Sequence, residues 1–401
     1  MRCRQLLSLV AVVAMIALAP TATAAAASSV GAAAAVGPVK GSSVVYTFGV
    51  AGTKGKVLRT EHEKPTAIEG IEGSVLQIAT SNSDTYALTS MGTVWAWGIG
   101  SNGELGNGSK TFYASRAVQV DFPQGVRIAS LPNPMPFDGG LAIDSRGDAW
   151  AWGLNAVHDL CLPDGLVVLH PTQIPLSDVT LGTGARTHSL FDSHGTVYAC
   201  GDGSYGELGN GSAANSPTPT AVVGLPEGGV KALMSSWGGS GALMSDGSYY
   251  DWGYNRAGQL GNGTTTDSSV PVHVALRAPV TQVFQGGSGP KNGQTLAILA
   301  DDSLWTWGNG AHGQLGDGTT HNATIPIRVT LPKGKKPATV ASGGFATYAI
   351  DTSGKLWAWG RNEAGQLGTG RSGPDQLTPR AVGLKLRQIS STAQNVAGLA
   401  G

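Results

Sequence analysis

The chain is poor in charge, in histidine and in cysteine, and each shortage excludes a class of function. Only 13% of its 401 residues are charged, and 26 basic residues balance 26 acidic ones. A balanced charge produces no field that concentrates nucleic acid or an anionic surface. The eight histidines are scattered, and the sequence has no HExxH, CxxC or GxSxG arrangement. We therefore predict no enzyme activity, no metal site, no cofactor and no nucleic-acid partner.

The N-terminal apolar run is too short for a transmembrane helix. It covers about 14 residues, 6–19, whereas a bilayer span needs roughly 20. Arg2 and Arg4 precede it, and the small-x-small triplet ending at Ala24 follows it, which is the pattern of a secretory signal. We predict a signal peptide over residues 1–24, a flexible Ala/Gly/Ser linker over 25–41, and a secreted protein that is off the membrane once cleaved. An uncleaved anchor is the alternative.

Cleavage would leave two of the three cysteines, Cys161 and Cys200. In an oxidising compartment a disulfide between them would persist. They lie in neighbouring repeats, but their Cα separation decides whether they can be joined. The sequence therefore leaves open both a disulfide and two small buried thiols.

Glycine and tryptophan, by contrast, are abundant, with 60 and 10 copies, and they recur in register. The strongest unit reads Trp305-Thr306-Trp307-Gly308, followed by the tail Gly313-Gln314-Leu315-Gly316-Asp317-Gly318. The glycines that end the related strands are 48 to 55 residues apart: Gly49, Gly98, Gly153, Gly201, Gly253, Gly308 and Gly360. A period near fifty is typical of a propeller or a similar array. The copy ending at Gly153 keeps the aromatic strand but loses the glycine tail, reading 155–164 instead.

Each period also contains a hairpin of short apolar runs, as in residues 341–354, so that it accounts for about four strands. The last repeat, 386–399, has only the inner half, and the first, 44–49, has only the aromatic strand. Joined, they make one more blade. We predict an all-β fold over residues 42–401: a seven-bladed β-propeller of four-stranded antiparallel blades, its ring closed by pairing of 44–49 with 386–399.

The pattern W-x-W-G-x-N-x-x-G-[EQ]-L-G-[ND]-G resembles the repeat of the regulator of chromosome condensation family, over about residues 42–401. The family's founding member is a nuclear exchange factor for a small guanine-nucleotide-binding protein and binds chromatin. Export and the lack of a basic footprint argue against that activity here, so exchange remains a remote alternative. The family often has a histidine before the Ala-Leu strand. Here Asp84, Gly239, Gln294 and Ala346 stand there, with His188 nearest in the fourth copy.

Two repeat positions have structural explanations. One position holds Glu104, Glu207, Gln259, Gln314 and Gln366. Because glutamine cannot titrate, general acid–base work is excluded, and a hydrogen bond that ties the loop to its own backbone is expected. The paired aromatics of W-x-W-G recur once per blade, so we expect them to pack between sheets instead of forming a ladder for sugars or bases.

Function is expected where the copies differ. The third copy has a proline-rich turn with Pro134 and Phe137, the fifth has Trp237, and the sixth has Lys291 in a longer loop over 286–293. Other non-repeat residues expected in exposed turns are Tyr205, Tyr254, Arg256 and Phe345.

We predict a monomeric, non-enzymatic scaffold that binds an extracellular protein through these loops. A cell-wall or glycan binder is the alternative. The propeller-type β-lactamase inhibitor is similar in architecture and export, although its repeats are shorter, and it suggests inhibition of an extracellular enzyme as one form of such binding.

Overall fold

The computed structural model describes residues 12–17, 44–49, 66–81, 84–163, 165–287, 289–363, 367–369, 372–386, 388–391 and 396–399. The regular secondary structure of this part of the chain is made of β-strands and two 3-10 turns, η1 (Pro290–Asn292) and η2 (Pro332–Gly334). None of its helices has the length and apolar character that a bilayer crossing requires.

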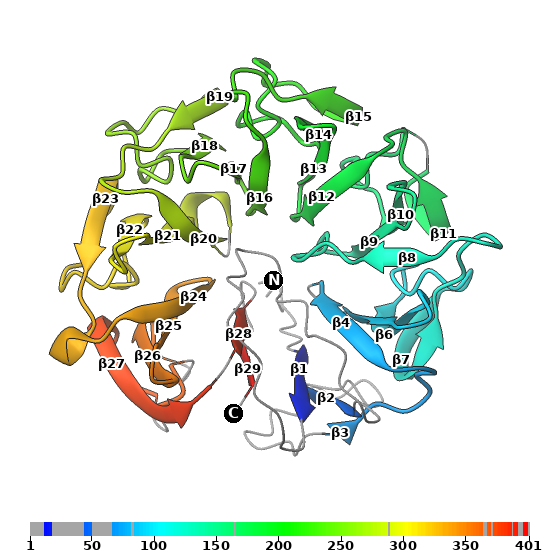
Figure 1. Cartoon of the computed structure of the whole chain (residues 1–401), viewed down its shortest axis with the longest axis horizontal. Helices are drawn as coiled ribbons and strands as arrows, with labels where there is room; N and C mark the ends of the chain where they lie inside the picture. Colours follow the sequence, from blue (N-terminus) through cyan, green and yellow to red (C-terminus); the bar gives the residue numbers. More distant parts are fainter. Residues whose placement is uncertain are drawn as a thin grey trace, which may run out of the picture.

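Six four-stranded antiparallel sheets follow one another around a central axis, each built from consecutive strands (Figure 1). The first two are β4 (Val75–Thr80), β5 (Asp84–Thr89), β6 (Val94–Gly100) and β7 (Thr111–Gln119), then β8 (Ile128–Ser130), β9 (Gly139–Asp144), β10 (Ala149–Leu154) and β11 (Val167–Gln173). The next two are β12 (Val179–Gly184), β13 (His188–Ser193), β14 (Thr196–Gly201) and β15 (Ser216–Ala221), then β16 (Val230–Ser235), β17 (Gly239–Met244), β18 (Tyr249–Gly253) and β19 (Ser268–His273). The last two are β20 (Val280–Gly286), β21 (Gln294–Leu299), β22 (Leu304–Gly308) and β23 (Ala323–Val329), then β24 (Pro337–Gly343), β25 (Ala346–Asp351), β26 (Lys355–Gly360) and β27 (Gln376–Lys385).

The terminal strands differ from the predicted closing blade. β1 (Val12–Ala17) pairs with β2 (Val44–Gly49), and β2 pairs with β3 (Thr66–Ala67). β28 (Gln388–Ser391) and β29 (Val396–Leu399) form a separate two-stranded sheet within the described residues. β1 also lies close to β29, between the strands that the sequence was expected to pair (Figure 1). The predicted direct pairing of 44–49 with 386–399 is therefore wrong for the full chain. The cause is that an apolar segment, ahead of the predicted cleavage site, takes the open hydrogen-bonding edge of β2.

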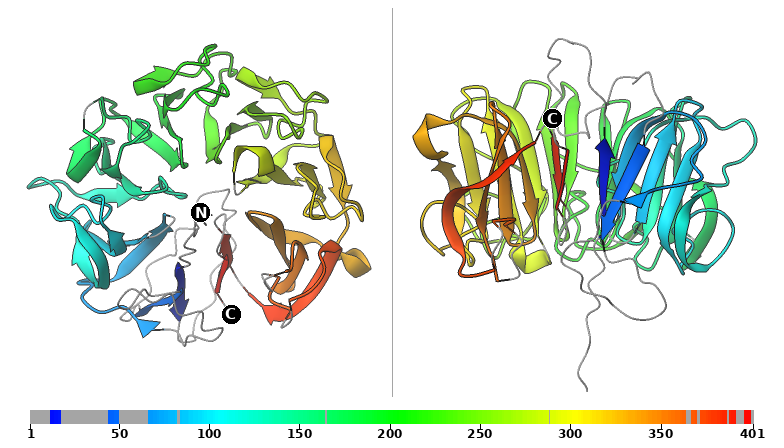
Figure 2. Two further views of the ribbon diagram at one scale, coloured as in Figure 1. Left: turned by 180° about the vertical axis from the view of Figure 1, so that it is seen from behind. Right: turned by 90° about the horizontal axis from the view of Figure 1, so that it is seen from below.

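Antiparallel order within each sheet divides the connections between two faces, seen edge-on in Figure 2. Loops joining the first strand to the second and the third to the fourth lie on one face, which we call the loop face. Turns joining the second strand to the third, and the links to the next sheet, lie on the opposite face, which we call the turn face. Sequence position within a repeat therefore determines which face a residue reaches.

Neighbouring sheets are joined by a glycine–indole contact. The indole nitrogen of Trp152 donates to the carbonyl of Glu104 at 2.8 Å, Trp252 to Glu207 at 2.7 Å, and Trp359 to Gln314 at 2.9 Å. Two residues after each carbonyl comes a glycine of positive φ on which that indole lies. At Gly106 (φ 60°), a Cβ would lie 2.8 Å from Cδ1 of Trp152. The expected inter-sheet packing of these tryptophans is confirmed, and it explains why tail and indole recur together.

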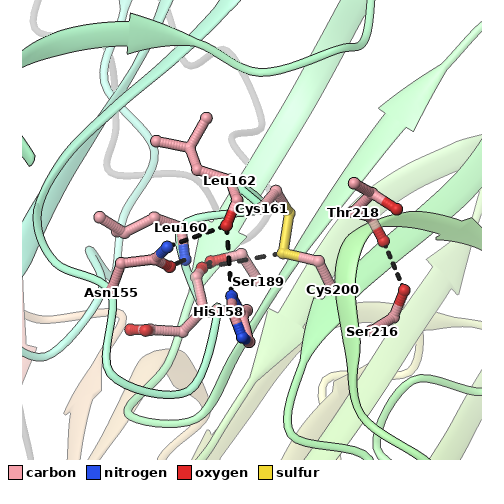
Figure 3. Close-up of a disulfide and its surroundings, with 10 residues drawn as sticks. Asn155, His158, Leu160, Cys161, Leu162, Ser189, Cys200, Ser216 and Thr218 are labelled. Carbon is pink, nitrogen blue, oxygen red and sulfur yellow. Dashed lines mark hydrogen bonds between the residues drawn. A yellow bond between two sulfur atoms is a disulfide. The ribbon is translucent and has the colours of Figure 1, made fainter. Parts of the chain in front are cut away.

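One boundary replaces this contact with a disulfide (Figure 3). Cys161 occupies the tail-glycine position and adopts φ 58°, and Cys200 stands where the next sheet would carry tryptophan. The two are bonded, with Cα atoms 5.2 Å apart, inside the usual range for a disulfide. Of the two alternatives left by the sequence, the disulfide is the one present.

The third copy keeps the path of the tail that its sequence lacks. His158 adopts φ 62°, where the preceding copy has Gly103. Asn155 holds the loop, because its amide donates to the carbonyl of Leu162 at 2.9 Å and its carbonyl accepts from the backbone N–H of Leu160 at 3.2 Å. The loss of tail glycines therefore changed the residues but not the course of the chain.

Candidate partner-binding face

All eight residues singled out from the sequence belong to loop-face connections. Pro134 and Phe137 lie between β8 and β9, Trp237 between β16 and β17, Lys291 between β20 and β21, and Phe345 between β24 and β25. The remaining three, Tyr205, Tyr254 and Arg256, follow third strands. Five blades thus bring the residues that depart from the repeat to a single side of the ring.

Phe137 and Trp237 meet around an arginine from the blade between them. Their ring centroids are 6.4 Å apart, and the guanidinium carbon of Arg186 lies 4.3 Å from the first and 4.4 Å from the second. Arg186 is exposed, whereas both rings are half-buried. Guanidinium groups are attracted to aromatic faces at this range. We call Phe137, Arg186 and Trp237 the aromatic–arginine cluster.

Hydrogen bonds in the adjoining blade fix the backbone of Trp237. The hydroxyl of Thr187 donates to the carbonyl of Trp237 at 2.9 Å. Next to it, His188 is fully buried, and its Nε2 lies 2.8 Å from the hydroxyl of Ser240. Burial lowers the pKa of His188 to about 4, so the imidazole is neutral at physiological pH. His188 pairs with Gly201, the register in which Asp84, Gly239, Gln294 and Ala346 pair in their own sheets, as the sequence comparison suggested.

The Tyr205–Tyr254 pair is only half exposed. The two rings pack edge to face with centroids 5.0 Å apart. Tyr205 keeps 37% of its surface exposed, but Tyr254 keeps only 7%. The expectation that Tyr254 lies in an exposed turn is therefore wrong, because Tyr205 covers it. Arg256 is exposed and forms an ion pair with Asp267 at 3.4 Å.

Phe345 belongs to a second aromatic cluster. The ring of His312 packs against it with centroids 4.7 Å apart, and the guanidinium carbon of Arg361 lies 5.3 Å from its centroid. His312 is held by Asp375 through a 2.8 Å contact of Nδ1. The sequence analysis missed Arg186, His312 and Arg361. They are ordinary polar residues in turns, and only the position of the neighbouring blade shows that they lie on aromatic rings.

The shared Glu/Gln position has the structural role expected of it. Its side-chain oxygen accepts the backbone N–H two residues earlier, at 2.6 Å for Glu104, 2.9 Å for Glu207, 2.8 Å for Gln259 and 2.8 Å for Gln314. The side chains of all four are buried. A glutamine satisfies this arrangement without carrying a charge into the interior.

Replacing Glu207 with glutamine is expected to stabilise the protein at alkaline pH. Burial, with a contribution from Asp202, raises the pKa of Glu207 to about 7. The pKa of Glu207 is higher in the folded chain than in the unfolded chain, so ionisation of this carboxyl destabilises the folded state. Its contribution to the free energy of folding is fully present below about pH 4.5 and is lost as the pH rises through about 7. The glutamine variant should be more stable by up to about 3 kcal/mol above pH 7, and the difference should vanish near pH 4.5. Urea denaturation at several pH values checks this, with exposed Glu227→Gln as control. An equal gain at pH 4.5 would contradict it.

No group of three or more His, Cys, Asp or Glu side chains among the described residues is placed to hold a metal ion. A cavity of about 20 Å³ is lined in part by Trp237, Asp251, Gln285 and Gln294, and it has room for roughly one water. Burial raises the pKa of Asp251 well above its ordinary value.

Comparison with known proteins accounts for the repeats. The sequence pattern of the Regulator of chromosome condensation (RCC1) repeat matches residues 194–243, 246–289, 301–350 and 353–397, and a second pattern for this repeat matches 338–366. The chain is an RCC1-repeat protein. Its relatives include the ultraviolet-B receptor UVR8 of Arabidopsis thaliana, 27% identical over 86% of this chain and 78% of that protein. Another is the mitochondrial RCC1 domain-containing protein RUG3 of the same plant, 29% identical over 73% of this chain and 66% of RUG3.

Solved structures share the RCC1-like propeller fold. Human WBSCR16 superposes with a TM-score of 0.69 at 22% identity, over 84% of this chain and 89% of that one. Prp20p of Saccharomyces cerevisiae superposes with a TM-score of 0.68 at 20% identity, over 82% and 83%. At these identities the likeness establishes the fold and does not transfer a partner.

Proposed function

We propose that this RCC1-repeat protein is a secreted, monomeric, non-enzymatic scaffold that binds another extracellular protein through its loop face, with inhibition of an extracellular enzyme as one form of that binding. The aromatic–arginine cluster carries the proposal. Three neighbouring blades contribute one residue each to a surface of two half-buried rings and an exposed guanidinium, and aromatic and arginine side chains are enriched at the centres of protein interfaces. The fold is compatible with this role, since the structure of Prp20p was described together with its binding to Gsp1p and histones.

The disulfide supports export, because disulfides persist in oxidising compartments. We propose that cleavage near Ala24 removes β1 and releases the edge of β2. β29 then pairs with β2, which completes a seventh blade and closes the ring over residues 42–401.

Closure of the ring is expected to appear as a change in amide protection. In the mature chain, starting at residue 25, the amides of β29 should exchange more slowly than in the precursor, because β29 would gain β2 as a second ladder partner, and the amides of β2 should stay protected although β1 is gone. In the precursor, the β1–β2 ladder should protect the amides of both strands, and those of β29 should exchange faster. Hydrogen exchange read by mass spectrometry distinguishes the two patterns. Freely exchanging amides over 44–49 in the mature chain would refute closure.

Binding through the loop face is tested by capture from the extracellular medium. Wild type and Phe112→Ala should recover the same protein, and the double variant Phe137→Ala/Trp237→Ala should lose it. Phe112 is a matched control, since it is an aromatic residue, 74% exposed, on an outer strand. Recovery that is unchanged in the double variant would refute the loop face. Retention of the wild type on purified cell wall, lost in Trp237→Ala, would instead favour glycan binding.

A further inference from the structure

Arg186 is the loop-face arginine whose charge is left without a partner within the described residues. Two other loop-face arginines form ion pairs: Arg256 with Asp267, and Arg361 with Glu363. No ion pair or hydrogen bond of the Arg186 side chain occurs in the described part of the chain; its contacts are the faces of Phe137 and Trp237. Contacts of this kind leave the planar fork of N–H donors unused, and this fork matches a carboxylate.

Two acidic groups, Asp138 and Asp159, lie near enough to Arg186 for its charge to lower their pKa. Asp159 is 4% exposed, and burial raises its pKa to about 7. Burial also raises the pKa of half-buried Asp138, while the charge of Arg186 opposes that rise. Neither carboxyl comes within ion-pair distance of the guanidinium. Arg186 therefore forms no ion pair with either carboxyl.

A second exposed cation belongs to the loop that lies next to Trp237. Lys291 is exposed in η1. The same loop approaches the indole closely, since a Cβ at Gly289 would lie 4.0 Å from Cε3 of Trp237. Trp237 is thus bordered by Arg186 from one neighbouring blade and by the Lys291 loop from the other.

We propose that an acidic segment of the partner protein binds across Trp237, with one carboxylate on the guanidinium of Arg186 and a second near Lys291. This inference rests on the proposed function and gives the chemistry of the partner at that surface. The rings of Phe137 and Trp237 hold the guanidinium in place before binding, which lowers the entropy lost when the carboxylate arrives.

Binding of poly-L-glutamate to the mature protein, measured by biolayer interferometry at 50 and 200 mM salt, tests the inference. Arg186→Ala is expected to weaken binding at least tenfold, and Lys291→Ala two- to fivefold. Arg186→Lys should recover only part of the loss, because an ammonium lacks the planar fork. Lys335→Ala is the matched control, an exposed cation next to η2 on the turn face. Poly-L-glutamine should not bind.

The outcomes separate this inference from the proposed function. The proposal of an acidic segment would be overturned if the wild type does not bind poly-L-glutamate. It would also be overturned if the Arg186→Ala variant binds poly-L-glutamate as tightly as the wild type. Equal weakening by Lys335→Ala would overturn it too, because the attraction would then be unspecific. If the wild type still captures an extracellular protein in a manner that depends on Phe137 and Trp237, the proposed function survives that failure. Loss of that dependence would refute the proposed function itself.

Discussion

Replacing Trp359 with alanine is expected to lower the free energy of unfolding by about 3–5 kcal/mol. The side chain is fully buried between two sheets, and its indole nitrogen donates to the carbonyl of Gln314 at 2.9 Å. Alanine leaves a cavity against Gly316 and removes the donor from a buried carbonyl, and both effects act in the same direction. Urea denaturation followed by tryptophan fluorescence or circular dichroism measures the change.

Trp305→Ala is the matched control for Trp359→Ala. Trp305 is the first aromatic of its W-x-W-G unit, is only half-buried, and donates to Ser303 within its own sheet at 2.8 Å. Replacing Trp305 should lower the free energy of unfolding by less than half as much as replacing Trp359, since the indole contact between sheets stays intact. Equal losses for the two variants would contradict the view that the second tryptophan joins neighbouring sheets.

Removing the disulfide with the double variant Cys161→Ala/Cys200→Ala is expected to cost about 4 kcal/mol. The bridge closes a loop with a sequence separation of 39 residues, and a loop of this length restricts the unfolded chain by roughly that amount. At this boundary the repeat has no indole, so once the disulfide is removed no glycine–indole contact remains to join the two sheets.

Reductant supplies the control for the disulfide. Dithiothreitol should lower the stability of the wild type toward that of the double variant and leave the double variant unchanged. Denaturation curves with and without reductant check both expectations. A wild type as stable when reduced as when oxidised would contradict a stabilising role for the bridge.

The sheets could be predicted from the sequence because each repeat contains the residues that determine its turns and its contact with the neighbouring sheet. The closing glycine, the tail glycines and the second tryptophan fix the turns and the contact between sheets, as Gly106 and Trp152 show. It also predicted which residues depart from the repeat, and their positions within the repeat place them on one face.

What could not be predicted depends on neighbours that are distant in the chain. The burial of Tyr254 depends on Tyr205, in the preceding sheet. The exposed guanidinium of Arg186 lies beside rings contributed by two other sheets. The strand at 12–17 pairs with the edge of β2, and the periodicity of the repeats does not include this segment.

The bridge at residues 161 and 200 restricts which blades can stand side by side. At the ordinary boundaries the two halves of the joint are a glycine and an indole, whereas here both halves are sulfur. A tryptophan in place of Cys200 would clash with the side chain of Cys161, because the indole packs against a glycine at the other boundaries. A glycine in place of Cys161 would leave a cavity next to Cys200. The β8–β11 and β12–β15 units are therefore complementary only to each other at this boundary, so an exchange of repeats between propellers would have to move both. The other units use the same glycine–indole contact and could be exchanged singly.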